Sequence, residues 1–173
     1  MPQHLFVYGT LRSESGHPLA RRLKTQARLV GKASAAGRLY DLGRYPGAIF
    51  QADDRERIIG EAFALRNAER LLAELDAYEG VVDPGSPAFK RVEIKARLDK
   101  GGVIDAWAYA LAEAPARSRR IEGGDFILHA RLREGRPNAF LAIPSLVYLC
   151  QADRAAKRAG SRSRRGTRDG KGR

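Results

Sequence analysis

The stretch Leu5-Phe6-Val7-Tyr8-Gly9-Thr10-Leu11-Arg12 decides how the fold of this chain is interpreted. Its apolar, β-forming residues stop at a glycine, which predicts a buried strand that ends in a sharp turn. Backbone N–H groups in such a turn point into one small concavity, where they can hold an anionic group. The alternative is that Gly9 only ends a core strand, and the stretch alone leaves both interpretations open.

The length and composition indicate one globular domain with appendages. The chain has 173 residues, of which 43% are hydrophobic and 30% charged, enough to bury a core of ordinary size. We expect a cytoplasmic protein without membrane contact, because the sequence shows neither a signal-peptide pattern nor an apolar stretch long enough to span a bilayer. The single cysteine, Cys150, allows no internal disulfide and no cluster of thiolate metal ligands.

The formal net charge of +12 is concentrated at the C-terminal end of the sequence. From Arg154 onward, nine Lys and Arg residues stand against one Asp, so this segment carries +8 and the rest of the chain about +4. Its Gly- and Ser-rich composition has almost nothing apolar to bury, which predicts a disordered basic tail. Such tails bind phosphate backbones without sequence preference, so nonspecific nucleic-acid contact is one expectation and a solvated tail without a partner is the other.

The hydrophobic periodicity predicts an α+β domain made of several short strands and a few helices. The clearest helix runs from Ala68 to Glu79 with Asn67 as its N-cap. Phe89 to Leu98 is an alternating run, and Val103 to Leu111 returns as its partner strand in a hairpin. Shorter elements are expected as helices after Pro18 and over 126–133, strands over 29–35, 38–42, 48–50 and 58–65, and turns at Ala36-Gly37 and Tyr45-Pro46-Gly47. Together these elements predict a small mixed barrel or a curled sheet.

Three parts of the chain are distinguished on this basis. Residues 1–128 form the folded domain, residues 129–153 are a C-terminal extension whose structure the pattern does not define, and residues 154–173 are the basic disordered tail.

Glu79 is the most interesting titratable residue. It follows Leu75 by four positions, so it lies near the apolar stripe of its predicted helix. It also occupies the last turn, where the helix dipole disfavours a carboxylate, and Asp76 adds a like charge nearby. These effects raise the pKa of a carboxyl group, which suits a base that acts on an ammonium group. The alternative is an ordinary exposed glutamate in a frayed last turn.

Other familiar chemistries find no support in the sequence. It contains no nucleophile elbow, no phosphate-binding loop and no dinucleotide fingerprint. The three histidines show no ligand spacing, so structural or surface roles are expected for them. Tyrosines on the predicted strands and turns either line a pocket or belong to the core, and these are Tyr40, Tyr45 and Tyr109.

Three motifs in combination resemble the signature of the γ-glutamylcyclotransferase-like superfamily, which includes small bacterial γ-glutamylcyclotransferases and γ-glutamylamine cyclotransferase-like proteins. They are Val7 to Arg12, Tyr45-Pro46-Gly47 and Leu75-Asp76-Ala77-Tyr78-Glu79-Gly80. The strands that begin near Phe89 and Ala106 are similar as well. The resemblance covers roughly residues 5–126, and it is specific because the motifs occur in the right order and at the right spacing.

The resemblance implies a small mixed β-barrel with flanking helices and a cavity beside the loop Tyr8-Gly9-Thr10-Leu11. In the family, the backbone of this loop binds the glutamyl part of the substrate, and the catalytic glutamate corresponds to Glu79. The implied reaction is of the acyltransferase or lyase type and requires no metal or cofactor. It releases 5-oxoproline from a small γ-glutamyl amine, peptide or amino acid, when the substrate's own α-amine attacks the γ-carbonyl.

These implications agree with the residue analysis. A free α-ammonium has a pKa of about 8, so a carboxylate with a raised pKa can serve as general acid and base, and we assign this role to Glu79. Amides around Gly9, Thr10 and Leu11 hold the α-carboxylate or polarise the carbonyl, and the sequence leaves these two roles open. Tyr8, Tyr45 and Tyr109 are candidate substrate-binding residues in the pocket wall.

One position departs from the family pattern. Members often carry a tyrosine shortly before the arginine of the strand that follows the catalytic helix, whereas this chain has Phe89 before Arg91. The lost hydroxyl could alter recognition of the leaving group. A second function also agrees with the sequence, namely a non-catalytic module of the same fold that binds a γ-glutamyl metabolite.

Overall fold

The computed structural model describes residues 1–43, 45–52, 55–79, 89–115 and 119–134, without the side chains of Glu79 and Glu134. Residues 80–88, which follow the helix that ends at Glu79, most of the predicted extension and the basic tail lie outside the described residues. Helix α3 runs from Phe126 to Glu134, across the predicted boundary at residue 128, and the division into three parts stays a prediction.

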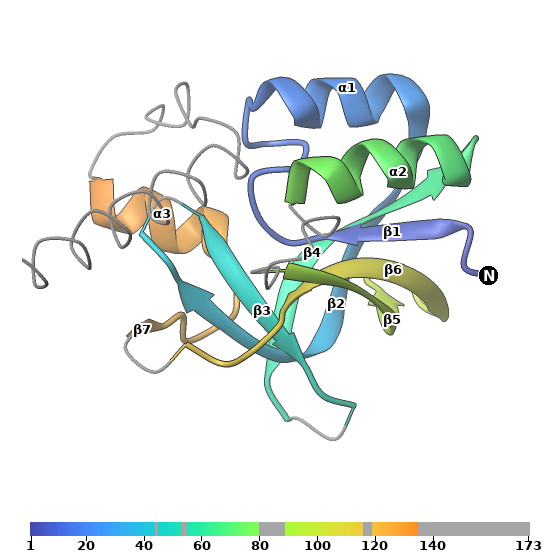
Figure 1. Cartoon of the computed structure of the whole chain (residues 1–173). Helices are drawn as coiled ribbons and strands as arrows, with labels where there is room; N and C mark the ends of the chain where they lie inside the picture. Colours follow the sequence, from blue (N-terminus) through green and yellow to red (C-terminus); the bar gives the residue numbers. More distant parts are fainter. Residues whose placement is uncertain (44, 53–54, 80–88, 116–118, 135–173) are drawn as a thin grey trace, which may run out of the picture.

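The described elements follow one another in the order shown in Figure 1. They are β1 (His4–Val7), α1 (Pro18–Gln26), β2 (Ala27–Asp41), β3 (Pro46–Phe50), β4 (Arg57–Leu65), α2 (Ala68–Glu79), β5 (Phe89–Leu98), β6 (Val103–Leu111), β7 (Arg119–Arg120) and α3 (Phe126–Glu134). No helix in these ranges is long and apolar enough to cross a membrane.

Five strands close into a mixed barrel. Going round it, β2 pairs with β4, β4 with β1, β1 with β6 and β6 with β5, and β5 returns to β2 through the pairing of Ala35 with Ala96. The pairing of β1 with β6 is parallel and the others are antiparallel, which makes the barrel mixed. The small mixed barrel predicted from the sequence is confirmed.

The barrel interior is narrow and is filled mainly by small side chains. A barrel with fewer strands encloses less space, so a five-stranded barrel accommodates few large residues. Phe6, 1% exposed, is a large residue of this buried cluster, which it shares with Ile58 of β4 and with alanines from the other strands. These fully buried alanines are Ala33, Ala35, Ala62, Ala96, Ala106 and Ala108.

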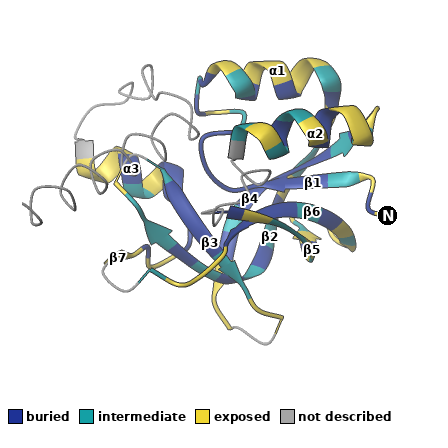
Figure 2. Ribbon diagram, in the orientation of Figure 1, coloured by how far each residue is buried: buried dark blue, intermediate teal, exposed yellow. Residues whose placement is uncertain are grey.

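A second apolar layer lies between the barrel and helices α1 and α2, which run side by side over β1 and β4 (Figures 1 and 2). Leu23 of α1 and Leu71, Leu72 and Leu75 of α2 are buried in it against Phe63 of β4. Both helices begin at side-chain caps, of which Asn67 was predicted from the sequence. His17 accepts a hydrogen bond from the Leu19 N–H, and Asn67 accepts one from the Arg70 N–H.

Helix α3 closes the other side of the molecule and is attached by apolar and ionic contacts. Phe126 and Ala130 are buried in the barrel core. Asp41, at the end of β2, holds the far end of the helix through His129 Nε2 at 3.1 Å and through the Arg133 guanidinium. The helix over 126–133 expected from the sequence is therefore confirmed.

Two of the expected turns are wrong. Residues 36–37 do not separate two strands, because β2 runs without interruption from Ala27 to Asp41. Its first part pairs with β4 and its last part with β3. Pro46 and Gly47 belong to β3, where they pair with Asp41 and Tyr40. A proline is tolerated there because it is the first residue of the strand.

Gly37 is required by close approach of the neighbouring strand. A Cβ atom at this position would lie 2.3 Å from the Ile49 carbonyl oxygen and 2.9 Å from Phe50 Cα, both backbone atoms of β3. Gly37, which suggested a turn, therefore lies where the backbone of β3 leaves no room for a Cβ atom on β2. A second glycine of β2, Gly31, also has a positive φ angle, but a Cβ atom there would meet nothing within 4 Å.

The two glycines provide a matched test of this packing. We expect Gly37→Ala to lower the free energy of unfolding by about 3 kcal/mol or more, because β3 must move away. Gly31→Ala carries only the backbone strain of a positive φ angle, about 1 kcal/mol. Urea denaturation of both variants measures the difference. Equal losses would contradict the close approach of β3 at Gly37.

Asp41 provides a test of the α3 attachment through pH. Burial raises the pKa of Asp41, but the hydrogen bond from the Gly43 N–H and the interactions with His129 and Arg133 outweigh it, so the pKa lies below the ordinary value. A lowered pKa in the folded state stabilises the fold above the pKa of the unfolded chain. This stabilisation is lost as the pH falls through the folded pKa.

We therefore expect Asp41→Asn to lower the free energy of unfolding by about 2 kcal/mol at pH 7, and by progressively less as the pH falls through the lowered pKa of folded Asp41. Urea denaturation at a series of pH values from 7 downward measures this difference. Asp105→Asn is the control, since this carboxylate is 55% exposed in its pair with Lys95 and should contribute about 0.5 kcal/mol or less. A loss for Asp41→Asn that does not depend on pH would refute the ionic attachment.

Candidate active site

The site forms where the chain leaves β1 and turns. The carbonyl of Gly9 accepts a hydrogen bond from the Arg12 N–H at 3.0 Å, and the carbonyl of Arg12 accepts one from the Ser15 N–H at 3.0 Å. Two turns thus follow the strand directly. A Cβ atom at Gly9 would lie 2.7 Å from Pro46 Cγ, so the loop packs closely against the start of β3.

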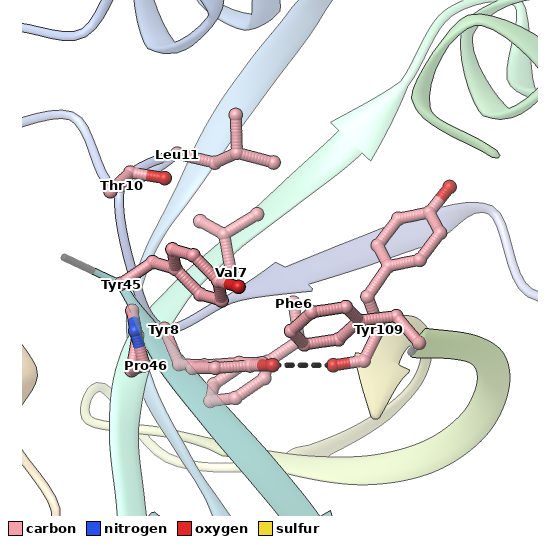
Figure 3. A pocket seen from close by; sticks show the side chains of 10 residues that line it. Phe6, Val7, Tyr8, Thr10, Leu11, Tyr45, Pro46 and Tyr109 are labelled. Carbon is pink, nitrogen blue, oxygen red and sulfur yellow. Dashed lines mark hydrogen bonds between the residues drawn. The ribbon is translucent and has the colours of Figure 1, made fainter. Parts of the chain in front are cut away.

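A cavity of about 40 Å³ lies beside this loop (Figure 3). Its lining contains no charged side chain and consists of Phe6, Val7, Tyr8, Gly9, Thr10, Leu11, Tyr45, Pro46, Phe89 and Tyr109. The structure thus brings together all six residues predicted from the sequence to bind substrate. The volume suffices for a few water molecules. A ligand as large as an amino acid requires lining side chains to move, and the half-buried Tyr45 is the most exposed aromatic residue among them.

Two lining tyrosines use their hydroxyl groups within the protein. The Tyr8 hydroxyl donates a hydrogen bond to the backbone carbonyl of Tyr109 at 2.6 Å, as the dashed line in Figure 3 shows. The Tyr109 hydroxyl in turn donates to Asp76 Oδ1 at 2.8 Å. Tyr8 and Tyr109 therefore form part of the cavity wall, while their hydroxyls link this wall to β6 and to α2, respectively.

The C-terminal part of α2 is attached to the barrel by Asp76. Its second oxygen, Oδ2, accepts a hydrogen bond from Arg91 Nη1 at 2.8 Å, and the Arg91 guanidinium lies 5.0 Å from the centre of the Trp107 ring. Arg91 thus compensates the negative charge that the sequence analysis expected to act on Glu79. Glu79 is the last residue of α2, and its side chain is outside the described part of the chain, so its assigned role and raised pKa stay predictions.

Buried polar groups hold the loop from below. Glu61 of β4 is 3% exposed, and its carboxylate accepts hydrogen bonds from the Ser13 backbone N–H at 2.7 Å and the Ser13 hydroxyl at 2.6 Å. The Ser15 hydroxyl donates to the Thr10 carbonyl. Glu61 was not predicted from the sequence. Its only signal there is that it is a single acidic residue inside the apolar run of β4.

An ion pair connects the loop to α3. Arg12 is 3% exposed and donates from Nη1 to Asp125 Oδ1 at 2.8 Å. The same oxygen accepts hydrogen bonds from the Ile127 and Leu128 N–H groups, so Asp125 also caps α3. The last residue of the decisive sequence stretch therefore serves to fix the loop, and it is absent from the cavity lining.

The structure also contains a larger hollow of about 520 Å³. Its charged lining residues are exposed, and among them Lys95 and Asp105 pair at 2.9 Å, a contact that raises the pKa of Lys95. It contains none of the predicted site residues. Among the described residues, no three His, Cys, Asp or Glu side chains gather in a way that could hold a metal ion.

Comparison with known protein families identifies one match. The model of the family described as "Gamma-glutamyl cyclotransferase, AIG2-like" matches residues 5–128. A curated relative from Escherichia coli K12, the "Gamma-glutamylcyclotransferase family protein YtfP", is 32% identical over 124 residues. That alignment covers 71% of this chain and 95% of the relative.

Solved structures share the fold. The solution structure of protein ytfP from Escherichia coli has 31% sequence identity and a TM-score of 0.51, over 73% of this chain and 98% of that chain. The crystal structure of YkqA from Bacillus subtilis has a TM-score of 0.59 at 24% identity, over 79% of this chain and 44% of that chain. The second likeness concerns the fold alone.

The ion pair between Arg12 and Asp125 allows a direct test of how the loop is fixed. We expect Arg12→Met to lower the free energy of unfolding by about 2 kcal/mol, because the carboxylate of Asp125 loses its buried partner but stays in part accessible to water. Arg70→Met, which removes a 76% exposed partner of Glu74, should cost about 0.5 kcal/mol or less. Urea denaturation compares the two variants, and equal small losses would rule out a structural role for the buried pair.

Proposed function

The chain belongs to the "Gamma-glutamyl cyclotransferase, AIG2-like" family, and we propose that it is an enzyme which releases 5-oxoproline from a small γ-glutamyl amine, peptide or amino acid. In this proposal the loop from Tyr8 to Leu11 holds the glutamyl part of the substrate. Glu79 acts as general acid and base.

One contact carries the proposal. The Tyr109 hydroxyl binds Asp76 at 2.8 Å, so a residue of the cavity wall is bonded directly to the helix that ends at Glu79. Asp76 precedes Glu79 by three positions, which is less than one helical turn. Through Tyr109, the motif around Tyr8 is thus linked by hydrogen bonds to the helix that carries the motif around Glu79.

The chemistry of the lining supports a substrate with one anionic group. Because no charged side chain lines the cavity, a carboxylate there would be bound by the backbone N–H groups of Gly9, Thr10 and Leu11. The same groups could instead stabilise negative charge that develops on the γ-carbonyl oxygen. Holding the substrate in a curled conformation brings its amine close to its carbonyl carbon, which lowers the entropic part of the barrier.

The proposed reaction forms one bond and breaks one. Glu79 removes a proton from the α-ammonium, and the amine nitrogen then attacks the γ-carbonyl carbon to form a five-membered tetrahedral intermediate. As this intermediate collapses, the bond between the carbon and the leaving nitrogen breaks, and Glu79 returns its proton to that nitrogen. The ring nitrogen gives its second proton to solvent, from which the released amine takes one up, so the products are the lactam 5-oxoproline and a free ammonium, peptide or amino acid.

The departure from the family pattern lies in the cavity itself. Phe89 lines it next to Tyr45, with the two ring centres 6.2 Å apart. We propose that this aromatic surface accepts the leaving part of the substrate without the hydrogen bond that a tyrosine hydroxyl would offer. The cytoplasmic location and nonspecific nucleic-acid contact through residues 154–173 stay predictions from the sequence.

The proposed role of Glu79 is tested by a single isosteric change. We expect Glu79→Gln to lower kcat for 5-oxoproline release by about 10²- to 10⁴-fold, because the amide cannot accept the proton, while the fold stays intact. Glu69→Gln, at the exposed first turn of the same helix, is the matched control and should keep wild-type rates. Mass spectrometry of 5-oxoproline across a panel of γ-glutamyl compounds measures the rates.

The outcomes separate the two candidate functions. Turnover by the wild type and the Glu69→Gln control, lost in Glu79→Gln, supports the enzyme. Thermal stabilisation by a γ-glutamyl compound without any product would favour the non-catalytic binding module, and turnover by Glu79→Gln at the wild-type rate would remove Glu79 from the mechanism.

A further inference from the structure

We propose that Tyr109 is a positioning residue that sets the distance between the substrate-holding loop and the end of α2. This inference rests on the proposed function for its catalytic consequences. Its structural basis is that Tyr109 contacts both halves of the site at once. Its backbone carbonyl accepts the hydrogen bond from Tyr8, and its hydroxyl donates to Asp76.

The contact on the loop side is rigid. Tyr8 is 7% exposed and precedes Gly9 directly, and its ring packs edge-on against Phe50 with the ring centres 5.8 Å apart. The hydrogen bond from its hydroxyl to the Tyr109 carbonyl is 2.6 Å long and buried. Because Tyr8 is held at both its ring and its hydroxyl, the position of Gly9 directly after it is restricted. The partner of the Tyr8 hydroxyl belongs to β6, so β6 determines where the loop amides lie.

The contact on the helix side has two points of attachment. Tyr109 of β6 and Arg91 of β5 are directly paired across the two strands. Side chains in such pairs lie close together, so they can reach the two oxygens of one carboxylate. Tyr109 binds Asp76 Oδ1 and Arg91 binds Asp76 Oδ2, each at 2.8 Å. Two attachments fix both the height and the rotation of the last turn of α2 above the sheet.

Tyr109 therefore connects the two elements whose relative position the proposed reaction requires, namely the loop after β1 and the end of α2. The loop binds the glutamyl group and the end of α2 carries the proposed base. An error of about 1 Å between such groups costs about 10²-fold in rate. Loss of the Tyr109 hydroxyl should loosen the helix side, whereas loss of the Tyr8 hydroxyl should loosen the loop side.

Steady-state kinetics of three tyrosine variants test the proposal. Tyr109→Phe keeps the ring and the backbone carbonyl, and we expect kcat to fall about 10- to 100-fold with KM within about twofold. Tyr8→Phe should mainly raise KM, by about tenfold, if the loop amides hold the substrate's α-carboxylate, because the charge of this group does not change during the reaction. Tyr40→Phe is the control, a strand tyrosine that does not line the cavity, and both constants should stay unchanged.

A double variant shows whether the hydroxyl acts through Asp76. If it does, Tyr109→Phe should have little further effect on kcat in an Asp76→Asn background, so the two effects are not additive. A purely local packing role would give additive effects. Additivity, or a Tyr109→Phe enzyme with the kcat of the Tyr40→Phe control, would overturn the proposal while leaving the proposed function intact.

Hydrogen exchange tests the same proposal without turnover. In Tyr109→Phe, the amides of residues 75–79 should exchange about tenfold faster than in Tyr40→Phe, because the last turn of α2 opens more often. If the wild type releases no 5-oxoproline from any γ-glutamyl compound, the proposed function fails, and this comparison alone decides the positioning role. Equal exchange in the two variants would contradict it.

Discussion

The number of strands in the barrel is the constraint on which the rest of the structure depends. A closed barrel of five strands encloses little space, so alanines line much of it and few large residues, among them Phe6 and Ile58, are buried inside. Other large apolar residues must be buried elsewhere. They form a second layer beneath α1 and α2, and this layer holds the two helices over β1, the strand that leads into the loop from Tyr8 to Arg12.

The site lies at the junction of the two apolar layers. Phe6 and Tyr8 belong to the barrel interior, whereas Val7 and Leu11 belong to the layer beneath the helices, and all four line the cavity. Because the cavity itself has no charged side chain, charge is used around it to fix its walls. The buried side chains of Glu61 and Arg12 hold the loop through their bonds to Ser13 and Asp125, and Asp76 holds the end of α2. In the proposed mechanism, this leaves the loop amides to bind and Glu79 to move the proton.

The sequence predicts those features that depend on neighbours along the chain. The capping of α2 by Asn67, the apolar stripe of that helix and the hairpin of β5 and β6 follow from local patterns, and the structure confirms them. The turn predicted at Gly37 is wrong, because a glycine required by close strand packing cannot be distinguished in sequence from a turn glycine. The bond from Tyr109 to Asp76 and the pair of Arg12 with Asp125 join residues far apart in the chain, and no local pattern indicates such partners.

The central claim is that the loop after β1 holds the glutamyl group while the end of α2 supplies the base. A crystal structure of Glu79→Gln with an intact γ-glutamyl amine bound tests this claim most directly. The account predicts that a carboxylate or carbonyl oxygen of the substrate lies within hydrogen-bond distance of the amides of Gly9, Thr10 or Leu11, with the α-amine facing residue 79. A γ-glutamyl group bound instead in the charged hollow beside Lys95 would contradict it.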